Sequence, residues 1–88
     1  MASYSIRFRP SVEKDVRRIA TSDLRRIFEQ IEALSADPFP RGVAKLAGAE
    51  GLYRVRAGNY RIIYEVDQPS HQIVIQYIRH RRDAYRRL

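Results

Sequence analysis

The sequence contains no cysteine, which excludes disulfides, cysteine-based zinc sites and a cysteine nucleophile. Lysine is nearly absent too: only Lys14 and Lys45 are lysines, and the other fifteen basic residues are arginines. No apolar run approaches the roughly 20 residues of a membrane-spanning helix, and the opening MASYSIRFRP has no apolar core of a signal peptide. We therefore expect a protein of the reducing cytoplasm with no membrane partner.

The excess of arginine makes the chain strongly basic, with a net charge of +7 over 88 residues. The charge is uneven, because residues 45–88 carry nine basic and four acidic groups whereas residues 1–44 carry eight and six. Arginine presents a planar fork that matches phosphate, and it stacks on nucleic-acid bases. A clustered basic surface indicates a polyanionic partner, either nucleic acid or an acidic protein, whereas solubility alone would not require clustering.

The first half of the chain predicts one strand and two helices. Residues 4–10 alternate in the manner of a half-buried strand that ends at Pro10. Apolar residues then recur at helical spacing in two segments, which Ser11 and Ser22 are placed to cap. Asp37-Pro38 ends the second segment.

The second half predicts a sheet. A loop rich in proline and glycine contains a short extended piece at Lys45-Leu46, and three strands follow at about 52–57, 60–67 and 72–79. Neither a linker nor a repeat divides residues 1–88, so we expect a single domain. The β-α-α-β-β-β order predicts an α+β fold in which a helical hairpin packs on one face of a mainly antiparallel sheet.

The stretch YRVRAGNYRIIYE, residues 53–65, indicates two strands joined by a two-residue turn at Gly58-Asn59, of type I′ or II′. Alternation places Arg54, Arg56 and Arg61 together on the face away from the helices, which should be open. The turn would set Arg56 directly opposite Arg61, and opposed like charges destabilise a sheet. A cluster that bears this cost indicates an anion-binding surface, although a solvated strand face is the plainer alternative.

The C-terminal segment RHRRDAYRRL, residues 79–88, holds five arginines and one acid. It also contains Tyr85, and arginine beside a stackable aromatic ring is a combination that binds single-stranded RNA. The alternative is a basic tail with Tyr85 packed on the body. His80 is a candidate general acid or base, since an ordinary histidine pKa near 6.5 suits proton transfer.

Other kinds of site find little support. His71 and His80 have no carboxylate companions at metal-ligand spacing, so we expect no metal. AGAEG lacks the Lys-Ser/Thr of a phosphate-binding loop, and nothing else indicates a small-molecule cofactor. An enzyme here would work through cations. RNA cleavage by its own 2′-hydroxyl fits this, because arginines align the phosphodiester and stabilise its charge while another group accepts the proton.

The block KLAG…LYRVRAGNYRIIYEV, the terminal IRHRRDAYRRL and the element order together resemble the RelE/ParE toxin superfamily, and most closely its RelE branch. The resemblance spans nearly the whole chain. It implies the toxin of a type II toxin–antitoxin pair, a metal-independent endoribonuclease that cuts mRNA codons in the ribosomal A site and inhibits translation. It also implies a cognate acidic antitoxin as partner, in the cytoplasm of a bacterium or archaeon.

The resemblance assigns roles to individual residues. It implies a catalytic set in which strand arginines surround the phosphate, a basic residue follows the last strand and an aromatic ring stacks on a base: Arg54, Arg56, Arg61, Arg81 and Tyr85. We add His80 to this set as the candidate general acid or base. Lys45, Arg79 and Arg82 form the expected RNA-binding set, and Arg79 or Arg82 could fill the role given to Arg81.

One departure from the family concerns the proton. Some relatives carry lysine at the positions of Arg54 and Arg56, and a lysine there is credited as the base. We favour His80 as the acceptor here, with Tyr85, activated water or weak activity as the alternatives. Two other functions stay open on the same fold: a ParE-like inhibitor of DNA gyrase, and a non-enzymatic basic module that binds nucleic acid or an antitoxin.

Overall fold

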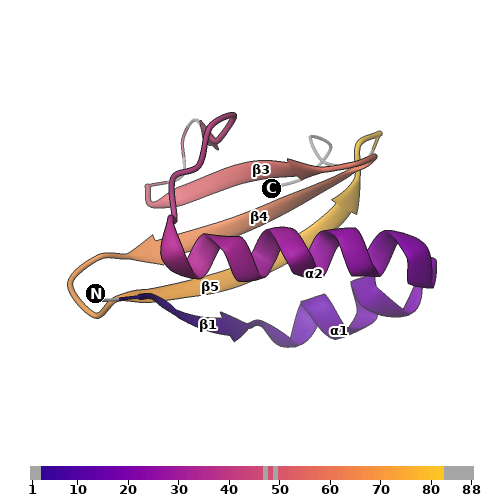
Figure 1. Ribbon diagram of the computed structural model, residues 1–88, viewed down its shortest axis with the longest axis horizontal. Helices are drawn as coiled ribbons and strands as arrows, with labels where there is room; N and C mark the ends of the chain where they lie inside the picture. The colour runs from indigo at the N-terminus through magenta and orange to yellow at the C-terminus, as the bar shows by residue number, and fades with distance from the viewer. Residues whose placement is uncertain (1–2, 47, 49, 83–88) are drawn as a thin grey trace.

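The computed structural model describes residues 3–46, 48 and 50–82. Two helices and a five-stranded sheet make up the fold (Figure 1). In chain order the elements are β1 (Ser5–Phe8), α1 (Pro10–Arg17), α2 (Thr21–Ala36), β2 (Ala44–Lys45), β3 (Leu52–Ala57), β4 (Tyr60–Asp67) and β5 (Gln72–His80). This confirms the predicted α+β order, and the expected short extended piece is the edge strand β2.

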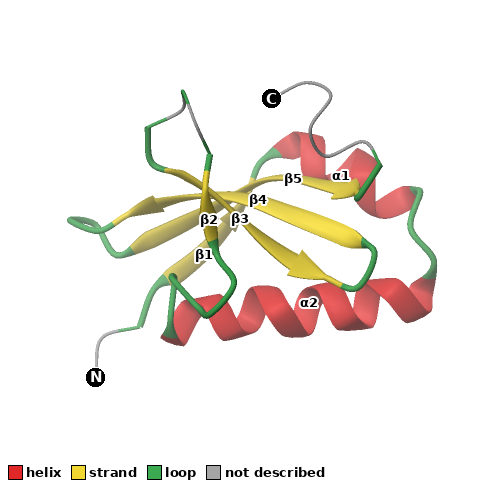
Figure 2. Ribbon diagram, turned by 90° about the horizontal axis from the view of Figure 1, so that it is seen from above, coloured by secondary structure: helices red, strands yellow, loops and turns green. Residues whose placement is uncertain are grey.

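The sheet has the strand order β1-β5-β4-β3-β2. β1 and β5 run parallel, whereas the other three neighbouring pairs are antiparallel. The long helix α2 lies across one face of the sheet, and α1 lies beside β5, beyond the end of β1 (Figures 1 and 2). Neither helix in the described part of the chain is long and apolar enough to cross a membrane.

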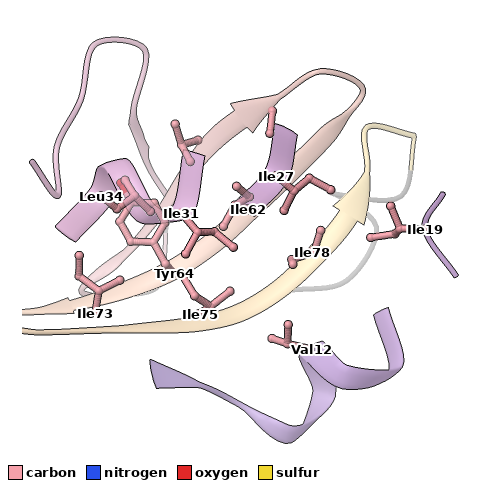
Figure 3. Close-up of a cluster of buried hydrophobic side chains, with 12 residues drawn as sticks. Val12, Ile19, Ile27, Ile31, Leu34, Ile62, Tyr64, Ile73, Ile75 and Ile78 are labelled. Carbon is pink, nitrogen blue, oxygen red and sulfur yellow. The ribbon is translucent and has the colours of Figure 1, made fainter. Parts of the chain in front are cut away.

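The core lies between α2 and one face of the sheet (Figure 3). Ile27, Ile31 and Leu34 project from the buried side of α2, as their helical spacing predicts. They meet buried side chains of the two central strands, Ile62 and Tyr64 of β4 and Ile73, Ile75 and Ile78 of β5. Each fully buried side chain of this size contributes about 1.5–3 kcal/mol relative to an exposed one.

Both helices begin differently from the prediction. Helix α1 begins at Pro10, whose fixed φ and missing N–H suit the first helical turn, and no side chain caps it. Ser11 lies inside that turn and donates its hydroxyl hydrogen bond to the Gln76 carbonyl of β5 at 2.8 Å. Helix α2 begins at Thr21 after Ala20, also without a side-chain cap, so the caps predicted at Ser11 and Ser22 were wrong.

A β-bulge interrupts the pairing of β4 with β5. Ile63 pairs with Tyr77, but the next residue, Tyr64, pairs with Ile75, so Gln76 is one extra residue in β5. One extra residue reverses which side chains face which side of the sheet. Ile73 and Ile75 lie on the helix side before the bulge, and after it this side is taken by Ile78.

Helix α1 supplies hydrogen bonds to the part of β5 that β1 does not reach. β1 pairs with residues 72–75 only. Beyond them Ser11 binds the carbonyl of the bulged Gln76, and the Asp15 carboxylate accepts from the Ile78 N–H at 2.9 Å. Side chains of one helix therefore satisfy backbone groups that a further strand would otherwise pair.

Replacing Tyr64 with phenylalanine should destabilise the fold by about 0.5–1.5 kcal/mol, because the buried hydroxyl donates to the Pro38 carbonyl at 2.7 Å. Urea denaturation at neutral pH measures this loss. Burial, Asp37 and Tyr53 raise the pKa of Tyr64, so its contribution is full below the ordinary tyrosine pKa and falls at higher pH. The difference between wild type and variant should therefore shrink above about pH 10; a constant difference would contradict this.

Candidate functional site

The hairpin between β3 and β4 sets the geometry of the site. Arg56 pairs with Arg61 and Ala57 with Tyr60, so the loop is the predicted two-residue turn. Gly58 has φ +63° and Asn59 has no positive φ, which is the type II′ pattern. The positive φ favours glycine here, whereas a Cβ would meet only the flexible end of the Arg26 side chain, 2.9 Å from a guanidinium nitrogen.

Four arginines gather at this end of the sheet, on the face that α2 does not cover: Arg54, Arg56, Arg61 and Arg81, hereafter the arginine cluster. Burial lowers the pKa of Arg61 below its ordinary value, and the positive charges of Arg56, Arg54 and Arg81 lower it further. The pKa direction means that the charged form of Arg61 is disfavoured by its surroundings. A bound anion would relieve that cost.

Two nearby backbone carbonyls hold the Arg61 side chain in place. Its guanidinium donates to the Tyr60 carbonyl at 3.2 Å and reaches the Gly58 carbonyl at 3.5 Å. Its Nε is buried and has no acceptor among the described residues. Arg61 is thus held at the centre of the cluster with part of its hydrogen-bonding capacity unused.

The face that carries the cluster is less open than predicted. Ile63 lies on it between Arg54 of β3 and Tyr77 of β5, yet only 1% of its surface is exposed. Arg54 and Arg61 are half-buried, and Arg56 is exposed. The arginine side chains therefore cover the apolar side chain of Ile63 instead of extending from freely solvated strands. This contact restricts their movement.

Arg79 lies next to Arg61 on the neighbouring strand, but it is not part of the arginine cluster. It pairs with Arg61 across β5 and β4, just as Arg56 does across β3 and β4. Its guanidinium nevertheless forms an ion pair with Asp15 of α1 and lies over the Tyr77 ring, 4.7 Å from the ring centre. Arg79 is absent from the charges that lower the Arg61 pKa, whereas Arg81 is present. Of these two residues, it is therefore Arg81 that adds positive charge around Arg61.

Arg81 is held in place by the hairpin turn. Its backbone N–H donates to the Asn59 carbonyl at 2.7 Å, so the chain beyond β5 stays beside the β3–β4 turn. Arg82 follows as an exposed residue, and its N–H lies 3.3 Å from Nδ1 of His80. Tyr85, predicted to stack on a base, lies outside the described residues.

His80 does not meet the arginine cluster. The bulge places it on the helix side of the sheet, where it pairs with Tyr60 and the two rings make an edge contact with centroids 5.3 Å apart. Without the bulge, simple alternation along β5 would have placed His80 on the cluster face. Lys45 pairs with Tyr53 and so also lies on the opposite side from Arg54. The structure therefore brings neither residue to the cluster.

Sequence reasoning missed Asp15 as a functional neighbour. The Asp15 side chain, 12% exposed, binds both the Arg79 guanidinium and the Ile78 N–H of β5. The available signal was the position of Asp15 four residues after Ser11, which places both on one helix face. The arrangement as a whole suits a phosphate or carboxylate. Within residues 3–46, 48 and 50–82, no three potential metal ligands gather.

Comparison with known proteins identifies the family. A family model described as the ParE toxin of the type II toxin–antitoxin system parDE matches residues 6–85. Toxin RelE1 of Methanocaldococcus jannaschii, described as putative, is 31% identical over 86 residues, which cover 94% of this chain and 96% of that relative. Toxin RelE of Mycobacterium tuberculosis is 33% identical over 76 residues, covering 76% of this chain and 78% of the relative.

Solved structures agree with this. The archaeal RelE–RelB complex from Pyrococcus horikoshii contains a chain that superposes with a TM-score of 0.79 at 32% identity, covering 90% of this chain and 96% of that one. The toxin–antitoxin complex RelBE2 from Mycobacterium tuberculosis gives a TM-score of 0.77 at 27% identity, with coverages of 89% and 98%. This chain therefore belongs to the RelE/ParE superfamily of type II toxin–antitoxin toxins, and within it to the RelE-like toxins.

Proposed function

We propose that this protein is a ribosome-dependent mRNA endoribonuclease that cuts codons in the A site and thereby inhibits translation. The observation that carries the proposal is the arginine cluster, in which Arg61 is held among like charges with its Nε lacking an acceptor in the described chain. The similarity to RelE toxins supports the same function. The proposed site of action places the protein in the cytoplasm.

In the proposed reaction the 2′-oxygen of one nucleotide attacks the adjacent phosphorus and the bond to the 5′-oxygen breaks. A 2′,3′-cyclic phosphate and a 5′-hydroxyl end result, and the proton of the 2′-hydroxyl must leave while one reaches the 5′-oxygen. Arg61 with Arg54, Arg56 and Arg81 would hold the phosphate and stabilise the charge that grows on it. Arginine supplies this charge stabilisation itself, so we propose that no metal is needed.

The proton acceptor is a separate question, since arginine stays charged at any working pH. His80 was the favoured base, but its position beside Tyr60 on the helix side separates it from Arg61. We therefore assign the proton to Tyr85 or to a water molecule activated by the cluster. Water is the simpler route, because concentrated positive charge lowers the pKa of a nearby hydroxyl.

The second proposed partner is a cognate antitoxin. The neighbouring structures from Pyrococcus horikoshii and Mycobacterium tuberculosis are toxin–antitoxin complexes. A chain with net charge +7 favours an acidic partner, whose carboxylates would satisfy the same arginines that otherwise hold a phosphate. Silencing would then follow from competition for the cluster.

Inhibition of DNA gyrase is the second candidate function, because the family model that matches is that of ParE toxins. That function would need the fold as a protein-binding surface and would place no chemical demand on Arg61. The arginine cluster favours the first candidate.

Replacing Arg61 with glutamine should reduce translation-dependent mRNA cleavage by about 10²-fold or more, because a central donor to the transition state is removed. Primer extension on mRNA after induction in growing cells measures the cut. The variant should be at least as stable as wild type at low salt, because the substitution removes a partly buried charge that Arg56, Arg54 and Arg81 repel. Arg25→Gln on the exposed surface of α2 is the matched control; cleavage by Arg61→Gln at the control's rate would remove the cluster from the mechanism.

Purified wild-type protein should leave gyrase supercoiling unchanged and trap no gyrase-bound DNA breaks. The same preparation should cut mRNA on programmed ribosomes. Trapped breaks without ribosomal cleavage would replace the first candidate function by the second.

Antitoxin binding should weaken steeply with salt, because it pairs opposite charges across an exposed interface. Titrations of the co-purified antitoxin from low to high salt measure this. Arg61→Gln should bind less tightly than Arg25→Gln at low salt, whereas equal affinities would place the antitoxin away from the cluster.

A further inference from the structure

A cavity of about 550 Å³ lies between α1 and the adjoining ends of β4 and β5. Four cationic or potentially cationic side chains, one carboxylate and one phenol ring line it: Lys14, Arg18, Arg79 and His80, with Asp15 and Tyr60. The arginine cluster lies on the face of the sheet that α2 does not cover. This second basic site is separate from the proposed catalytic one.

The one carboxylate that lines the cavity already has two partners within the protein. Asp15 accepts from the Ile78 N–H and forms the ion pair with Arg79, so its charge is balanced by these two donors. Lys14 lies on α1 and Arg18 directly follows the helix, four residues further along, and both are exposed. Neither of these two side chains forms an ion pair or hydrogen bond with another described residue, and the mouth of the cavity is therefore cationic.

Part of the wall is aromatic. His80 and Tyr60 make their edge contact here, because the bulge turns His80 to the helix side of the sheet. The Nδ1 of His80 accepts from the Arg82 N–H, so Nε2 is the ring nitrogen that can contact a ligand. Cations and aromatic rings that line one cavity form a surface suited to a phosphate and its attached base.

The two basic sites meet at one strand end. His80 is the last residue of β5 and lines the cavity, whereas the next residue, Arg81, acts on the arginine cluster. We propose that the cavity binds a backbone phosphate of single-stranded RNA that continues from the cluster around the end of β5. The inference rests on the proposed function in that RNA is the ligand. An acidic protein segment is the competing occupant, and the continuity with the cluster together with the aromatic wall favours RNA.

The test measures binding of a short, fluorescently labelled single-stranded RNA carrying 2′-O-methyl groups, which cannot be cleaved. The double variant Lys14→Ala/Arg18→Ala should bind about tenfold to hundredfold more weakly than wild type, because charge-assisted hydrogen bonds to the phosphate are removed. Its plot of log affinity against log salt should also be less steep by about 0.7 for each phosphate that the variant no longer neutralises. Arg25→Ala/Arg41→Ala removes the same charge from exposed positions outside the cavity and serves as the control.

An equal loss of affinity in both double variants would assign the effect to net charge and overturn the proposal, as would unchanged binding by Lys14→Ala/Arg18→Ala. A variant that binds RNA normally but loses affinity for the antitoxin would assign the cavity to the protein partner. Circular dichroism melting verifies that each variant is folded. Failure here is distinguishable from failure of the proposed function, because Arg61→Gln reports on cleavage independently.

Discussion

The extra residue in β5, Gln76, determines which side chains face which side of the sheet near the site. Every side chain beyond it lies on the side opposite to the one that uninterrupted alternation would give. This places Ile78 in the core, aligns Arg79 with Arg61 and sends His80 to the helix side. Ser11 and Asp15 of α1 hold the bulged segment through the Gln76 carbonyl and the Ile78 N–H. The register of one strand and the position of one short helix therefore depend on each other.

The same contacts organise the charges. Arg79 would be one more cation beside Arg61, but the ion pair with Asp15 draws it toward α1. Burial lowers the pKa of Arg61, and the other arginines of the cluster repel its charge and lower that pKa further. A domain of 88 residues has little stability to spare, so repulsion of this kind agrees with the anion site proposed above. In the proposed function, the charge of Arg61 therefore serves anion binding at a cost in stability.

Local patterns in the sequence predicted much of this fold. The bounds of β3 and β4, the two-residue turn and the pairing of Arg56 with Arg61 follow from alternation and from Gly58, which are local properties. The bulge could not be predicted in this way, because it is stabilised by a helix more than sixty residues away in the chain. The positions of His80 and Arg79 depend on that bulge, so the sequence alone left open which side of the sheet each would face.

The contacts between α1 and β5 also bear on how the protein behaves at high concentration. An unpaired strand edge offers a row of backbone donors and acceptors to any other chain, and it is a common starting point for aggregation. Here Ser11 and Asp15 occupy such groups just beyond the end of β1, and the Asp15 charge lies beside them. A second molecule cannot add a strand there without displacing the helix, so the contacts that fix the site also protect this edge from self-association.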